Sequence, residues 1–457
     1  EGKSFNEISR GMEKLSTCEV LSERKKAYRL KGKVSDIMHA CALPTDKVSV
    51  EALDSKGPIP EWTKEISPID RVRCAAKLYS KASCIDEGIK FFEKANDLAS
   101  QKSDTYLKAK NLKDLGNEYA KASTPEYYEK ALSCYDSATD LFNELGNSVR
   151  LMETMLDKVN VLRRTRRFDE ADELLEKLDI LIHENESEKS ILKIKVRKRL
   201  MKGLILGMGR RDKESREKAL VVLKEAVDLN DGFVGLQAAV LNASGLIKYQ
   251  TAGNSIDILK SGAEDLNAAF RLNIYIGDAR SCFQQMRNIG LIHSKLSRLE
   301  GKPELLEKAI QEFRRGEKFL FRLSRSRIMG ELLEIRFRLG ESLVAASRFS
   351  EAQPILSAVR DERVKIADWH NEARTLELLL KCATDDPSEL TKRAQQVKDI
   401  YEDALTNESK RSRFVKVPIT AANGRQILQT ASDLVSDVDL TLSIELQQLS
   451  NKLFDET

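Results

Sequence analysis

Very few side chains in this sequence have the types and spacing that catalysis or metal binding requires. The four histidines are His39, His183, His293 and His370, and no two of them stand four residues apart. No HExxH motif, serine-nucleophile motif or kinase signature occurs, and His39 with Cys41 is too isolated to specify a zinc site. We therefore predict that the protein is not an enzyme and that it has no catalytic residue, no metal site and no cofactor.

The stretch GLILGMGRR, residues 203–211, comes closest to a phosphate-binding loop. It lacks the GxxxxGK[ST] pattern and follows no predicted strand, so it is not a P-loop. Its first half instead predicts a helix, with Gly207 at a helix crossing and Gly209 near the helix end.

Four clusters of basic residues could contact phosphate groups if several of them shared one face. A charge run is more often a solvated helix face, and no aromatic RNA-binding motif accompanies these clusters. A basic solenoid that binds nucleic acid therefore stays open as an alternative. The clusters are RRTRR (163–167), KIKVRKR (193–199), FRLSRSR (321–327) and KRSR (410–413).

Composition predicts a folded helical chain with a large solvated surface. The 457 residues are 41% hydrophobic and 32% charged, they include only 9 prolines, and strong helix formers are frequent. The net charge of +4 does not by itself indicate nucleic acid or an anionic membrane. No apolar run approaches the roughly 20 residues that span a bilayer. Seven cysteines without a CxxC pair suit reduced thiols, so we expect a cytoplasmic protein.

A recurring pattern of small and large residues predicts paired helices. Gly116 and Tyr119 in one helix are followed by Ala131, Tyr135 and Ala138 in the next. Because glycine costs about 1 kcal/mol in a helix interior, we expect Gly116 at a close helix crossing, with Tyr135 filling the space above it. Six further instances have, in their first helix, Ala76 and Tyr79, Val159 and Leu162, Leu206 and Gly207, Leu241 and Gly245, Met286 with Ile289 and Gly290, and Leu339 and Gly340.

This pattern resembles the tetratricopeptide-repeat family over residues 69–360. The repeats here are longer than the family's standard 34 residues. They are similar to the soluble attachment proteins of membrane fusion and to the sensor arrays of signalling ATPases, and the residues do not distinguish between the two. The resemblance implies an all-α, right-handed α-solenoid of helix pairs with helical caps at both ends.

We expect three parts in the chain. The C-terminal part includes a polar, basic stretch with Pro418 and Gly424, which predicts a loop. The parts are N-terminal helices with a proline-rich connector (1–68), about seven helix pairs (69–360), and C-terminal helices with a basic loop at 407–426 (361–457).

The same resemblance implies a binding groove along the inner face of the first helices. Lys113 and Asn117 match the lysine and asparagine with which family members hold a peptide carboxylate. Because lysine, arginine and asparagine donate hydrogen bonds to carboxylates, we expect an acidic protein or peptide partner. We expect these side chains to be exposed along one wall. The predicted groove residues are Arg73, Lys77, Lys113, Asn117, Asn160, Arg163 and Arg287.

The function expected from these observations is that of a non-catalytic scaffold, sensor or adaptor that binds a partner segment in its groove. Two alternatives stay open. One is the nucleic-acid-binding solenoid, and the other is a regulatory fragment of a larger multidomain enzyme, which the start at Glu1 without a methionine suggests.

Circular dichroism of the purified chain should show helix as the dominant signal and essentially no sheet. The reason is that strong helix formers are frequent and β-branched runs are scarce. A large strand content would contradict the repeat assignment.

Overall fold

The computed structural model describes seven stretches of the chain, and the regular structure in all of them is helical. No strand occurs within these stretches, which confirms the predicted all-α repeat fold. The predicted N-terminal helices and connector, and the basic clusters at 321–327 and 410–413, lie outside the described residues. The stretches are residues 68–81, 85–122, 124–185, 190–210, 212–320, 329–407 and 418–454.

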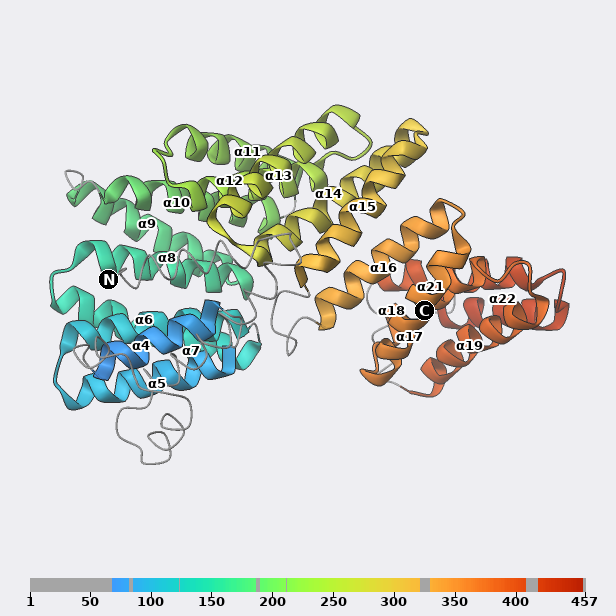
Figure 1. Ribbon diagram of the computed structural model, residues 1–457, viewed down its shortest axis with the longest axis horizontal. Helices are drawn as coiled ribbons and strands as arrows, with labels where there is room; N and C mark the ends of the chain where they lie inside the picture. The colour runs from blue at the N-terminus through green and yellow to red at the C-terminus, as the bar shows by residue number, and fades with distance from the viewer. Residues whose placement is uncertain are drawn as a thin grey trace, which may run out of the picture. The chain divides into compact units, whose positions relative to one another are not determined.

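Consecutive helices form antiparallel pairs along the chain, as Figure 1 shows. The first helix of each pair is named A and the second B. The A helices are α4 (Pro68–Lys81), α6 (Thr105–Ala122), α8 (Ser148–Arg164), α10 (Ile191–Leu204), α12 (Val234–Thr251), α14 (Ala279–Glu300), α16 (Met329–Ala345), α18 (Trp369–Lys381) and α21 (Pro418–Val435). The B helices are α5 (Ile85–Gln101), α7 (Pro125–Glu144), α9 (Phe168–Glu184), α11 (Lys213–Asp228), α13 (Ile256–Ile276), α15 (Pro303–Leu320), α17 (Phe349–Lys365), α19 (Pro387–Thr406) and α22 (Leu440–Phe454).

The described chain divides into two compact units. The first unit ends at Gln285 and the second begins at Met286, within α14. The helices α4 to α13 therefore belong to the first unit, and α15 to α22 belong to the second. The predicted division of the chain at residues 68 and 360 stays a prediction.

Helix boundaries follow the local sequence. The helix α7 begins at Pro125, and the Thr124 hydroxyl before it accepts a hydrogen bond from a backbone N–H in the first turn at 3.4 Å. Asp212 caps α11 in the same way, with 2.7 Å between its carboxylate and the Ser215 nitrogen. The helix α13 ends at Ile276, and the next residue is Gly277, whose φ of 79° is left-handed and suits glycine.

The pairs are held at close crossings between a glycine of the A helix and a large side chain of the B helix. A Cβ atom added at Gly116 in α6 would lie 2.7 Å from Cε1 of Tyr135 and 3.2 Å from the carbonyl oxygen of Ala131. This geometry confirms the predicted crossing, with Tyr135 filling the space. The same arrangement joins Gly245 to Leu266, Gly290 to Phe313 and Gly340 to Leu356.

The fourth pair departs from this pattern, because α10 continues into a π-helix, η2 (Ile205–Arg210). Gly203 takes the place opposite Leu223 of α11. Gly207 lies at a crossing, as predicted, but its nearest neighbour is Ile247 of the following pair. A π-turn shifts the register of the residues after it, and such turns are frequent at functional sites.

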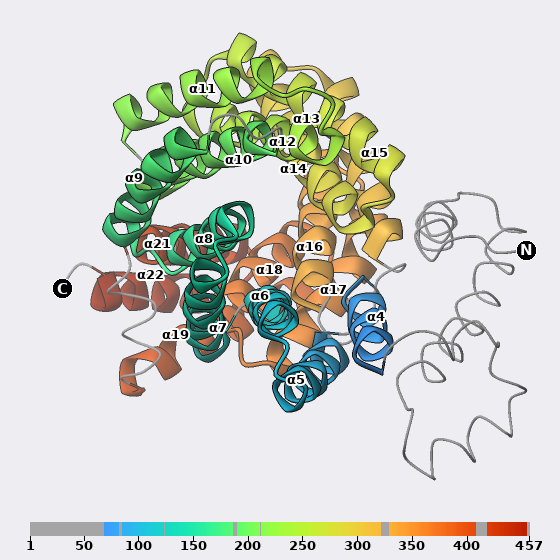
Figure 2. The ribbon, with the colours of Figure 1, turned by 90° about the vertical axis from the view of Figure 1, so that its left-hand side faces the viewer.

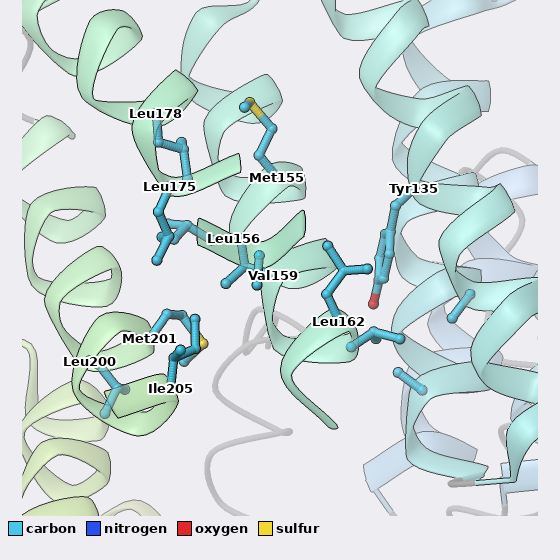
Figure 3. Packing of buried hydrophobic residues seen from close by; sticks show 14 of the residues in the cluster. Tyr135, Met155, Leu156, Val159, Leu162, Leu175, Leu178, Leu200, Met201 and Ile205 are labelled. Carbon is cyan, nitrogen blue, oxygen red and sulfur yellow. The ribbon is translucent and has the colours of Figure 1, made fainter. Parts of the chain in front are cut away.

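The core of the first unit runs without interruption from α4 to α12. The α8 side chains of Leu156 and Leu162 are fully buried in it. Figure 3 shows Leu162 beside Tyr135 of α7 and Leu156 beside Leu175 of α9. The helices α6, α8, α10 and α12 thus each pack on their own B helix and on the preceding pair, so that neighbouring pairs share one core.

The C-terminal helices differ from the prediction at one point. The helix α21 begins at Pro418, so the predicted loop at 407–426 is wrong for residues 418–426. Proline is accommodated in the first turn of a helix, because backbone N–H groups there have no hydrogen-bond partner within the helix. Gly424 does not break the helix, because it marks another close crossing. An added Cβ there would lie 2.6 Å from Cζ of Phe454.

Replacing Gly116 with alanine is expected to destabilise the first unit by about 1–3 kcal/mol, because the added methyl group meets a buried ring. Tyr135 is fully buried and its hydroxyl donates a hydrogen bond to Asn117 at 2.8 Å, so a movement of the ring would disturb the core and break this bond. Urea unfolding followed by circular dichroism measures the change.

The matched control is Gly235→Ala in α12, where the nearest atom to an added Cβ is 3.9 Å away. This change should stabilise the chain by about 0.4–1 kcal/mol, since alanine loses less backbone entropy than glycine. Equal effects of the two substitutions would show that Gly116 is not at a tight crossing.

Candidate functional site

The A helices form the inner layer of the first unit. The helix α8 contacts both α6 and α10, and α10 contacts α12. Figure 2 shows α8, α10 and α12 on the inner side of the row, with α9, α11 and α13 outside. Side chains on neighbouring A helices can therefore meet although they are 40 or 41 residues apart in sequence.

Two of the predicted groove residues lie at the α4 end of this layer and share one carboxylate. The Arg73 guanidinium is 2.9 Å from Asp114 on α6, and the Lys77 ammonium is 3.4 Å from the same side chain. Arg73 is only 5% exposed, whereas the side chain of Lys77 is 48% exposed. Of this pair, Lys77 alone reaches toward solvent.

Lys113 makes the equivalent contact one pair further along. Its ammonium lies 3.0 Å from Glu153 and 3.7 Å from Asp157, both on α8. Asp157 in turn receives Arg197 of α10 at 2.6 Å. Charges of opposite sign thus alternate from α4 to α10. We call this set the ion-pair ladder, and it consists of Arg73, Lys77, Lys113, Asp114, Glu153, Asp157 and Arg197.

The expectation that the groove cations are exposed is wrong for two of them. Arg73 and Lys113 are buried, with 5% and 9% of their surface exposed. The physical reason is the repeat itself, because residues at the same helix position come together on neighbouring A helices. The sequence pattern placed the cations on the inner layer but did not reveal the carboxylates that meet them.

The pKa of Glu153 shows the effect of the cations around it. Burial works to raise the pKa of Glu153, but Lys113 and Arg150 outweigh it and hold the pKa below the usual carboxyl range. Arg150 lies 2.8 Å from the same carboxylate. Glu153 is therefore a charged group that two cations keep ionised inside the layer.

Like charges lie close together at the α4–α6 end of the ladder. Lys110 of α6 is half-buried, and its pKa is lowered by burial and by the nearby charges of Arg73 and Lys77. The nearby Asp114 carboxylate raises this pKa, but the lowering effects prevail. Lys77 and Lys110 therefore repel each other beside Asp114.

Asn117, the second residue of the predicted carboxylate clamp, lies one helical turn after Lys113. Its side-chain oxygen accepts the Tyr135 hydroxyl at 2.8 Å. This bond occupies the acceptor of the amide and leaves its nitrogen as a donor. The helix crossing thereby fixes which atom of Asn117 can face a ligand.

The remaining predicted residues are not part of the ladder. Asn160 accepts a hydrogen bond from Arg163 at 2.9 Å, and Arg163 lines a separate pocket at the end of α8. Arg287 belongs to the second unit, where its guanidinium donates to Asn288. The role of these residues in partner binding stays a prediction.

The basic cluster at 193–199 is largely neutralised by neighbouring helices. Lys198 pairs with Asp179 of α9, and Arg199 lies 3.3 Å from Glu225 of α11. Arg197 is a member of the ion-pair ladder. These side chains point to different partners and do not form one phosphate-binding stripe.

Sequence reasoning missed an arginine cluster in the second unit. The guanidinium carbons of Arg363 and Arg374 lie 4.5 and 4.8 Å from the centre of the Phe337 ring. Phe337 also lines a cavity of about 380 Å³ together with Glu341, Arg374, Glu377 and Lys381, whose charges balance. In the sequence, the only sign of this cluster was the aromatic residue Phe337 next to Arg338. The other arginines, Arg363 and Arg374, lie more than 20 residues further along the chain and on other helices.

The described residues contain no group of three side chains that could hold a metal ion. None of the described helices is long and apolar enough to cross a membrane. Cys134 and Cys382 are free thiols, and burial raises the pKa of Cys134 to about 11. The Cys134 thiol is therefore protonated and unreactive near neutral pH.

Residues 71–229 match the family model of the soluble NSF attachment proteins. This match confirms the predicted resemblance to long-repeat variants of the tetratricopeptide-repeat family. It covers α5 to α11 and most of α4, and it includes every member of the ion-pair ladder. No curated protein matches the sequence.

Solved structures of helical-repeat proteins are similar to the chain at low identity. The apo form of RapI gives a TM-score of 0.45 at 13% identity, over 67% of this chain and 77% of RapI. A signal transduction ATPase with a tetratricopeptide-repeat sensor, from Pyrococcus horikoshii, gives 0.46 at 13% identity, over 99% of this chain and 65% of the ATPase. Neither likeness bears on function, and the fold assignment rests on the helix pairs themselves.

Replacing Lys113 with methionine is expected to destabilise the first unit by about 1–3 kcal/mol at pH 7, because two buried carboxylates lose a shared cation. The depressed pKa of Glu153 contributes stability above the ordinary carboxyl pKa of 4.5, and this contribution is lost as the pH falls through the folded-state pKa. The deficit of the variant should therefore be full at pH 7 and shrink below about pH 4. Urea unfolding at both pH values measures it.

The control is Lys130→Met on α7, which removes an exposed pair with Glu126. This change should leave the unfolding curve where it is, since exposed pairs contribute little. A Lys113 variant as stable as the parent at pH 7 would show that the ladder does not hold the A helices together.

Proposed function

We propose that the chain is a non-catalytic protein-interaction scaffold whose inner A-helix layer binds an extended acidic segment of a partner. The observation that carries this proposal is the repulsion between cations at the α4–α6 end. There Arg73 and Lys77 contact Asp114, and their charges lower the pKa of the neighbouring Lys110. A carboxylate of a partner would relieve the mutual repulsion of the two lysines and Arg73.

The part of the ion-pair ladder around Lys113 supports the proposed site but does not belong to it. Lys113 is already shared by Glu153 and Asp157, so a partner carboxylate would have to displace two buried ones. We therefore assign Lys113 the task of holding α6 against α8. Lys77, Lys110 and the amide nitrogen of Asn117 remain as donors on the same two helices, which suits a peptide running across them.

The family match supports a binding role of this kind. The matching family is described as soluble NSF attachment proteins, and the matched residues 71–229 include the proposed site. Helical repeats in general present elongated surfaces to partner chains. The acidic character of the partner rests on the charges of α4 and α6 alone.

The two alternatives have less support. Nucleic-acid binding needs several basic clusters on one face, and the cluster at 193–199 is engaged by carboxylates. No observation on the described residues favours a regulatory fragment of an enzyme over a scaffold.

Fluorescence anisotropy with a labelled glutamate-rich peptide tests the proposal. The double variant Lys77→Glu, Lys110→Glu should weaken binding by about tenfold or more, because two charge-assisted contacts become repulsive. Raising the salt concentration should weaken binding of the parent protein in the same direction.

The matched control is Lys90→Glu, Lys94→Glu, which makes the same charge change on the exposed face of α5. It should leave the affinity within about twofold. If both double variants weaken binding equally, net charge and not the inner layer attracts the peptide, and the proposed site is wrong.

A further inference from the structure

A second, unassigned pocket lies at the end of α8, apart from the ladder. It has a volume of about 320 Å³, at the lower end of the range for small-molecule sites. It is formed by the last turn of α8, the first turns of α7 and α9, and the π-helix η2. Its lining residues are Tyr128, Arg163, Arg164, Arg166, Phe168, Met208 and Gly209.

The local sequence builds this pocket through one tight turn. Arg166 adopts a φ of 63°, and the N–H of Arg167 bonds the carbonyl of Leu162 at 2.9 Å, which closes the end of α8. The turn brings three arginines and the start of α9 to one place. The π-helix closes the far side, because Gly209 lies against the Phe168 ring, where an added Cβ would be 2.7 Å from Cε1.

The charge of the pocket is unbalanced. Three of the seven lining residues are arginines, and none of the described lining residues is acidic. Carboxylates in the neighbourhood are engaged elsewhere. Asp172 is held by Lys202 and Arg210 at 2.7 and 2.6 Å, and Glu170 is held by Arg167 at 2.5 Å.

Arg163 shows this imbalance most clearly. Its Nη2 donates to Asn160 at 2.9 Å, but its buried Nε has no hydrogen-bond partner within the described residues. Burial and the neighbouring charge of Arg164 lower the pKa of Arg163 to about 10. A partly buried guanidinium whose buried Nε has no described hydrogen-bond partner is costly to the folded chain, so an anion that enters the pocket would satisfy it.

We propose that this pocket binds a phosphate monoester attached to an aromatic or apolar body. Guanidinium groups match phosphate oxygens in geometry, and the partial positive charge at the start of α9 favours a dianion. Tyr128, Phe168 and Met208 provide the apolar wall for the attached body. One face of Tyr128 is covered by the guanidinium of Arg164, 5.0 Å from the ring centre. This proposal is independent of the acidic-segment site on α4 and α6.

Titration calorimetry with phenyl phosphate and phenyl sulfate tests the proposal, because the two ligands have nearly the same shape but differ in charge. At pH 7.5 the phosphate ester is mostly a dianion and the sulfate ester a monoanion. We expect phenyl phosphate to bind at least about tenfold more tightly than phenyl sulfate. Equal binding of the two esters, or no binding of phenyl phosphate, would overturn the proposal.

The variant Arg163→Met separates a ligand role from a structural one. It should weaken phenyl phosphate binding by about tenfold or more and raise the melting temperature of the unliganded chain, because an uncompensated buried charge is removed. The control Arg167→Met removes a charge four residues away that is paired with Glu170, and it should leave binding within about twofold. A lower melting temperature with unchanged binding would show that Arg163 serves the fold only.

The variant Arg166→Met is a second test of the pocket, because Arg166 is exposed and its replacement should not affect folding. It should weaken phenyl phosphate binding severalfold, and unchanged binding counts against the pocket. Two further ligands identify the source of the phosphate. Tighter binding of a phosphotyrosine peptide than of a nucleoside 5′-monophosphate assigns the site to a modified partner, and the reverse order assigns it to a free metabolite.

Discussion

The close crossing of A and B helices is the constraint on which the rest of the structure depends. At Gly116 the backbone of α6 approaches α7 so closely that a single methyl group would meet the Tyr135 ring. This approach brings each pair into one compact layer, and it fixes the rotation of the A helix about its own axis. The hydroxyl of Tyr135 then reaches Asn117, so the packing inside the pair also sets the orientation of a side chain on the inner surface.

Once the rotation of each A helix is fixed, polar positions of successive repeats must face one another. The ion-pair ladder is the result, with Lys113 between two carboxylates of α8 and Asp157 between two cations. Hydrophobic packing holds A to B helices, while charge pairing joins one A helix to the next. The inner layer is therefore not a uniformly basic groove. Many of its described cations are paired with carboxylates of the protein itself, and at the α4–α6 end Lys77 and Lys110 lie close enough to repel each other.

The pocket at the end of α8 shows the opposite balance. In the ladder every buried cation has a carboxylate, whereas Arg163 has a buried Nε without a described hydrogen-bond partner. Groups that destabilise the folded state and have no structural role are typical of binding sites, because the ligand supplies the missing interaction. The π-helix η2 beside the pocket also departs from regular structure. It interrupts an α-helix, and it brings Gly209 against the Phe168 ring in the pocket wall.

The amino-acid sequence by itself determined the helices, their pairing and the crossing at Gly116. These features depend on residues close together in the chain, where helical period and side-chain volume decide the outcome. It also identified Lys113 and Asn117 as residues of the inner A-helix layer. Only the tertiary structure decided which carboxylates neutralise Lys113, because partners 40 residues apart meet only when the register between repeats is set. For the same reason Gly424 was misread as part of a loop, since the Phe454 ring that explains it lies on the following helix.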